Sequence, residues 1–183
     1  MGDISLPDPV KLIVGMLSGR RELLDQAAER LGAEYGPIDL TSDIIDFDFT
    51  HYYDRQMGGP LLRQFVAFER LITPDEIAAV KLATNRLEAE FAAAARAGPQ
   101  RPVNLDPGYV AEGKLVLASV KDHAHRIYLR DGIYAEVTLR HAAGRWTASQ
   151  HTFPDYASGA YDAFLTDARR LLRVALGRKE RQA

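Results

Sequence analysis

The segment VNLDPGYVAEGKLVLASV (Val103–Val120) sets the fold class, because it predicts two strands joined by a turn at Glu112-Gly113. The stretch from Leu115 to Val120 is almost entirely apolar. Such a run is typical of a central strand that is covered on both faces. The second half of the chain is therefore expected to form a sheet built from hairpins.

A second hairpin is predicted in HRIYLRDGIYAEVTL (His125–Leu139). A three-residue loop, Arg130–Gly132, with Gly132 at positive φ gives the cleanest division into a polar and an apolar face. This register pairs Leu129 with Ile133, Ile127 with Ala135, Tyr128 with Tyr134 and Arg126 with Glu136. The polar face is either a solvated surface with an exposed ion pair worth under ~1 kcal/mol, or the floor of a ligand cleft where Arg126 holds an anion.

The rest of the chain alternates helices and strands. We expect strands in the ranges 11–18, 45–50, 61–72 and 145–150, with helices in 18–32, 73–98 and 160–176. The sequence therefore predicts one α+β domain over residues 1–183, with a mixed, mostly antiparallel sheet of about seven or eight strands, three main helices and an early βαββα order. Its core is expected to cover about residues 11–176, with flexible ends at 1–9 and 178–183.

Composition excludes several classes of function. The 183 residues carry a formal net charge of -2 and no cysteine, so nothing points to nucleic acid, and disulfides, thiolate catalysis and cysteine-bound metals are excluded. No apolar stretch approaches the ~20 residues of a membrane span. Neither GxxxxGK[ST] nor GxGxxG occurs, so a P-loop NTPase and a dinucleotide-binding domain are unsupported. We expect a soluble cytoplasmic protein.

Polar residues cluster in NLDPGY and KDHAHR, at the outer ends of the first predicted hairpin. Because the ends of paired strands meet at one edge of a sheet, these segments are expected to form one polar cleft. Its predicted acid–base residues are Asp106, His125 and Glu136. Its predicted ligand-binding residues are Asn104, Lys121, Arg126, Tyr52 and Tyr53, and Asp106 with Asp122 could bind a divalent metal. Turn chemistry at Asp106 and a solvated loop at KDHAHR are the plainer alternatives.

The sequence also resembles a known family. The segments FDFTHYYDRQMG, KLATNRLE, RPVNLDPGY, KLVLASVKDHAHRIYL, GIYAEVTL and TFPDY, spread from Lys11 to Leu172, resemble the prokaryotic domain-of-unknown-function family forty-four sixteen. The resemblance implies no established activity, although some members are labelled GTP-binding, and Gln56 departs from the acidic residue expected before Met57. The polar residues in the matching motifs are Asp48, Tyr52, Tyr53, Asn85, Glu88, Asn104, Asp106, Lys121, Asp122, His125, Arg126, Glu136 and Asp155.

Two functions follow from these patterns. The first is binding of a small anionic or phosphorylated ligand or a nucleotide in the polar cleft, with chemistry on that ligand and a divalent metal as further expectations. The second is a non-catalytic binding or assembly role for a tyrosine-rich surface. Whether the protein is an enzyme stays open at this point.

Overall fold

The computed structural model describes residues 2–50, 53–95 and 98–178. In these residues the chain forms nine strands, five α-helices and one 3-10 helix, so the predicted α+β class is confirmed. The elements, in chain order, are β1 (Val10–Ser18), α1 (Arg21–Tyr35), β2 (Ile38–Thr41), β3 (Ile45–Phe47), α2 (Asp54–Met57), β4 (Leu61–Ile72), η1 (Pro74–Glu76), α3 (Ile77–Ala94), β5 (Asn104–Ala111), β6 (Lys114–Ser119), β7 (Ile127–Arg130), β8 (Ile133–Ala142), β9 (Arg145–Ala148), α4 (Pro154–Ala157) and α5 (Asp162–Ala175).

The strands form one sheet in the order β2-β4-β1-β5-β6-β8-β7, with β3 also paired to β4 and β9 to β8. All of these pairs are antiparallel. The sheet thus has more strands than the seven or eight expected, and β2 interrupts the predicted βαββα order. None of the described helices is long and apolar enough to cross a membrane.

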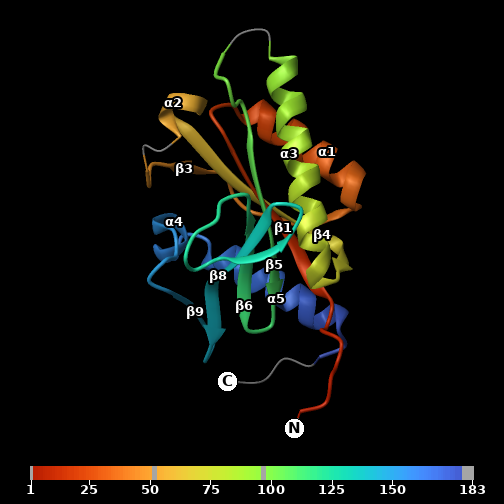
Figure 1. Cartoon of the computed structure of the whole chain (residues 1–183). Helices are drawn as coiled ribbons and strands as arrows, with labels where there is room; N and C mark the ends of the chain where they lie inside the picture. Colours follow the sequence, from red (N-terminus) through yellow and green to blue (C-terminus); the bar gives the residue numbers. More distant parts are fainter. Residues whose placement is uncertain (1, 51–52, 96–97, 179–183) are drawn as a thin grey trace.

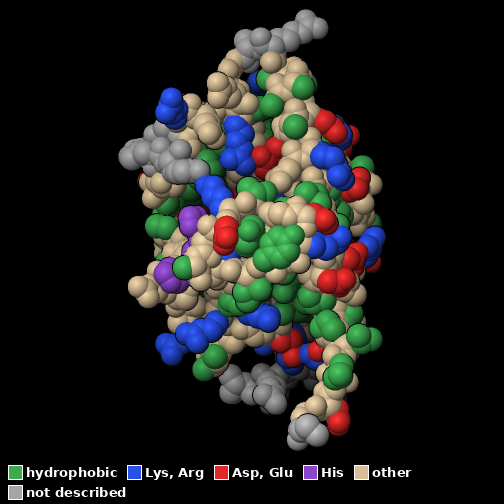
Figure 2. Space-filling view, viewed as in Figure 1, with side chains coloured by type: hydrophobic (Ala, Val, Ile, Leu, Met, Phe, Trp, Pro, Cys, Tyr) green, Lys and Arg blue, Asp and Glu red, His purple; other side chains and the backbone are tan. Residues whose placement is uncertain are grey.

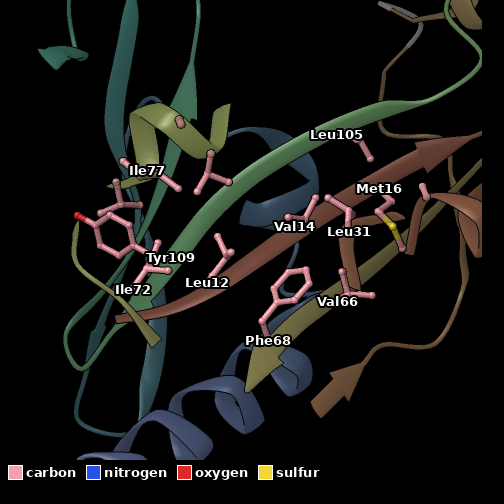
Figure 3. Packing of buried hydrophobic residues seen from close by; sticks show 14 of the residues in the cluster. Leu12, Val14, Met16, Leu31, Val66, Phe68, Ile72, Ile77, Leu105 and Tyr109 are labelled. Carbon is pink, nitrogen blue, oxygen red and sulfur yellow. The ribbon is translucent and has the colours of Figure 1, made fainter. Parts of the chain in front are cut away.

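Helices cover both faces of the sheet (Figure 1). Helices α1 and α3 pack on one face, where Leu12, Val14 and Met16 of β1 join their apolar side chains (Figure 3). Helix α5 covers the other face, where Ile13 of the same strand packs with Phe65 and Phe164. Because β1 lies between two layers, all nine of its residues are buried, as an almost unbroken apolar run requires.

The β7–β8 turn corrects the predicted loop. Its two residues, Asp131 and Gly132, both have positive φ, as a type I′ turn requires. Arg130 therefore pairs with Ile133, so the three-residue loop was wrong. A register shift between Tyr128 and Arg130 then restores the predicted pairs Tyr128–Tyr134 and Ile127–Ala135. The bulge in β7 therefore sets the strand register that the third loop residue was expected to set.

Candidate functional site

The sheet splits between β5 and β6, and the candidate site lies at this split. The two strands pair only from Ala111–Lys114 to Gly108–Leu117. Beyond that point β5 continues beside β1 to Asn104, while β6 continues beside β8 to Ser119. A Cβ at Gly108 would lie 2.4 Å from the carbonyl oxygen of Val116, so only glycine allows the strands to meet there. The diverging strands leave a cleft of about 450 Å³.

Side chains of α3 form hydrogen bonds with the backbone of β5 where β6 no longer pairs with it. The Leu105 N–H donates to Oε1 of Glu88 at 2.8 Å, and the Leu105 carbonyl accepts from Nζ of Lys81 at 2.9 Å. These bonds replace those of a neighbouring strand, so the buried main chain stays paired. Glu88 also forms an ion pair with Arg101, at 2.7 Å.

The cleft carries an excess of positive charge. Among the described residues that line it, five are Lys or Arg (Arg63, Lys81, Arg101, Lys121 and Arg126) and three are Asp or Glu (Asp106, Glu136 and Asp155). Lys81 is only 5% exposed, and no carboxylate of the described residues lies within ion-pair distance of its ammonium group. The carboxylates of Glu88 and Asp106 are close enough for the charge of Lys81 to favour their ionised forms. This buried cation therefore has negative charge nearby but, among the described residues, no direct ion pair.

Arg63 lies under the cleft between two carboxylates. Its guanidinium is 3.1 Å from Asp106 and 3.7 Å from Asp155, and Asp155 also accepts a hydrogen bond from the Tyr161 hydroxyl at 3.0 Å. Burial disfavours the charged form of Asp106, but Arg63 and Lys81 outweigh it and lower the pKa of the carboxyl. Burial instead prevails at Asp155 and raises its pKa despite Arg63. The site thus holds two carboxyl groups with opposite shifts.

A second buried group forms the opposite wall. Nε of Arg126 donates to Oε2 of Glu136 at 2.6 Å, and Nη1 donates to Oγ of Ser119 at 2.7 Å. The predicted contact between Arg126 and Glu136 is therefore present, but it is not exposed: the two side chains are 5% and 4% accessible. The pair cannot be the solvated surface bridge of the plainer interpretation, because both charges are removed from water.

His125 contacts the same carboxylate, with its Nε2 3.0 Å from Oε2 of Glu136. Its ring stacks on His151 at 4.5 Å between centroids and on His123 at 5.9 Å. Histidine side chains gather on one part of the visible surface, with Lys or Arg side chains near them (Figure 2). His125 lines a neighbouring depression with His151 rather than the cleft itself, and of the described residues only Glu136 lines both.

The structure brings together most of the predicted site residues. Asn104, Asp106, Lys121, Arg126, Glu136 and Tyr53 all line the cleft, whereas His125 lies behind Glu136. Asp122 is not among the described residues that line the cleft. Tyr52 lies outside the described residues. Among the described residues, no group of three or more His, Asp or Glu side chains is arranged to hold a metal ion.

Of the Lys, Arg, Asp and Glu side chains among the described residues that line the cleft, four were not predicted to be part of the site: Arg63, Lys81, Arg101 and Asp155. Asp155 belongs to the TFPDY motif of the family resemblance, which was a usable signal. Arg63 lies on the same buried face of β4 as the apolar residues Leu61 and Phe65, and a charge at such a position was a second signal. The tyrosines do not share one surface, since Tyr109 is buried in the core, Tyr53 lines the cleft and Tyr128 is exposed on β7.

Comparison with known proteins agrees with the sequence resemblance. A family model described as Domain of unknown function (DUF4416) matches residues 8–171. No curated protein and no solved structure matches the chain.

Proposed function

Because the chain belongs to the DUF4416 family, described only as a domain of unknown function, we propose a function from the cleft itself: it binds a small anionic ligand, such as a phosphorylated metabolite. The observation that carries the proposal is Lys81. Its ammonium group is buried in the cleft wall, and its one bond among the described residues is to the Leu105 carbonyl. An ammonium has three donors, so two remain for a ligand.

The other cationic side chains of the cleft also favour a negatively charged ligand. Lys121 is exposed at the mouth of the cleft, and Arg126 lines the wall nearby. A focused positive potential in a concave site favours anions even on a chain whose net charge is -2. That net charge also favours a small molecule over a nucleic acid as the partner.

Lysine and arginine side chains, rather than a metal ion, neutralise the negative charge of the ligand. Asp106 and Glu136 are the ionisable groups that could exchange a proton with a bound ligand. A nucleotide is one of the anions to be screened, and neither a P-loop nor the family description favours it over the others. A cytoplasmic location is part of the proposal, and it fits a chain without cysteine.

The test is a thermal-shift screen of phosphate, sugar phosphates, nucleotides and carboxylates, followed by calorimetry on the best anion. A ligand that binds only the folded protein raises its Tm. Lys121→Ala should weaken binding by about ten-fold, because a charge-assisted hydrogen bond contributes ~1.5–3 kcal/mol. Lys114→Ala is the control, since this lysine is exposed at the other end of β6 and does not line the cleft. Equal losses in both variants, or no anion that binds, would overturn the proposal.

A further inference from the structure

The cleft also has an apolar wall, which restricts the ligand further. Phe47, at the end of β3, packs against Phe49 and Tyr53, with ring centroids 5.7 and 6.0 Å apart. All three rings line the cleft. Phe49 and Tyr53 are only partly buried, so part of their apolar surface faces the cleft rather than the core.

A second aromatic surface lies beside a cation. Phe153, just before α4, lines the cleft and keeps 42% of its surface exposed. The guanidinium carbon of Arg126 lies 5.9 Å from the centre of its ring. At this position a ligand meets a positive charge and a flat apolar surface next to each other. A ligand that covered Phe153 would remove that surface from water, which is favourable at roughly 25 cal/mol per Å².

The size of the cleft agrees with this combination. Its volume of about 450 Å³ falls in the range of roughly 300–1,000 Å³ that is typical of sites for whole organic ligands. Inorganic phosphate would fill little of this volume, because it is only a few times larger than a water molecule, which occupies roughly 30 Å³ in the liquid. A purely polar anion, such as a sugar phosphate, would leave the aromatic surfaces of Phe49, Tyr53 and Phe153 uncovered.

From these observations we propose that the ligand is an aromatic anion, in which a phosphate or carboxylate is attached to a planar ring. The anionic group lies among Lys81, Lys121 and Arg126, and the ring lies against Phe153. This inference rests on the proposed function and names the ligand class of the same site. Phosphate and carboxylate share the required charge, so the experiment includes both.

The test measures affinities by calorimetry for two matched pairs of probes: phenyl phosphate with glycerol 3-phosphate, and benzoate with acetate. The wild-type protein should bind the aromatic member of at least one pair about ten-fold more tightly. Phe153→Ala should remove most of that preference and lower the affinity for the aromatic member much more than that for the aliphatic member. Tyr128→Ala is the control, because Tyr128 is an aromatic residue outside the cleft that is even more exposed than Phe153.

The negative results can be told apart. If aromatic and aliphatic members bind equally well, the aromatic ligand is wrong while an anion site stands. If Phe153→Ala keeps the preference, the placement of the ring against Phe153 is wrong. If none of the four probes and no anion of the wider screen binds, the anion site is wrong and this inference falls with it. If the preference is seen only with the phosphate pair or only with the carboxylate pair, it identifies the anionic group.

Discussion

Arg63 reaches Asp106 across the backbone of β1, with Nη1 3.1 Å from Oδ2. Their strands, β4 and β5, do not pair with each other, because β1 lies between them. The residue of β1 at the crossing is Gly15, which pairs with Phe65 on one side and with Asp106 on the other. A side chain at this position would occupy the space through which the guanidinium passes.

Gly15→Ala should therefore destabilise the protein. The added Cβ would lie 2.8 Å from Cε1 of Phe65 and 3.1 Å from Nη1 of Arg63, and both groups are confined in the core. Overpacking of this kind costs about 1–3 kcal/mol. Urea unfolding measures the loss. Gly113→Ala is the control, since a Cβ there meets nothing within 4 Å and its φ is not positive, and it should be neutral or slightly stabilising.

The charge of Asp106 should make the stability of the fold depend on pH. Folding lowers the pKa of this carboxyl below its ordinary value of 3.8. The ionised form therefore stabilises the fold above that pH, and the contribution is lost as the pH falls from 3.8 through the lowered value. Asp106→Asn should cost about 1–3 kcal/mol at pH 7, and the gap to the wild type should narrow towards pH 3.

Urea unfolding at several pH values between 7 and 3 checks this dependence. Asp25→Asn is the control, because Asp25 is exposed on α1. A gap between wild type and Asp106→Asn that stays constant over the whole range would show that the charge of Asp106 does not stabilise the fold.

The elements that depend on local patterns could be predicted from the sequence. One example is the start of the segment that leads into α3. Thr73 and Glu76 have the spacing of a capping box, and the Glu76 carboxylate accepts a hydrogen bond from the Thr73 N–H at 2.7 Å. The positive φ of Gly132 was another. In both cases residues within four positions of each other carry the signal, so no knowledge of tertiary packing is needed.

The site could be predicted only in part, because its shape depends on where strand pairing stops. The polar motifs pointed to Asn104, Asp106 and Arg126, and all three line the same cleft. They could not show that β5 and β6 separate beyond Gly108, which brings Lys81 from α3 into the wall. The burial of Arg126 could not be predicted either. Local sequence does not show how much of a long side chain is covered by tertiary packing.

Glu88 should prove necessary for the edge of β5. Glu88→Ala leaves the Leu105 N–H without its acceptor, which costs about 1–3 kcal/mol, whereas Glu88→Gln keeps a carbonyl there and should cost less. Amide hydrogen exchange of Leu105 should accelerate in the alanine variant more than in the glutamine variant. Glu90→Ala is the control on the same helix, since the pair of Glu90 with Arg30 is exposed and contributes under ~1 kcal/mol. Equal exchange in Glu88→Ala and the wild type would contradict this role.

The buried pair of Arg126 and Glu136 should be far more sensitive than a surface ion pair. Arg126→Met keeps most of the side-chain volume but leaves the Glu136 carboxylate buried with, among the described residues, His125 and Thr138 as its side-chain partners. Breaking such a pair costs about 3–5 kcal/mol. Arg126→Lys should recover only part of this, because a single ammonium lacks the planar fork that serves both Glu136 and Ser119.

The double variant Arg126→Met/Glu136→Gln separates lost charge pairing from lost packing. It removes both charges together, so it should be more stable than Arg126→Met alone if an unpaired buried carboxylate is the cause of the loss. Arg170→Met is the matched control, because Arg170 and Asp167 form a half-exposed pair on α5, and its effect should stay below ~1 kcal/mol. If Arg126→Met costs no more than Arg170→Met in urea unfolding, the Arg126–Glu136 pair is not part of the scaffold.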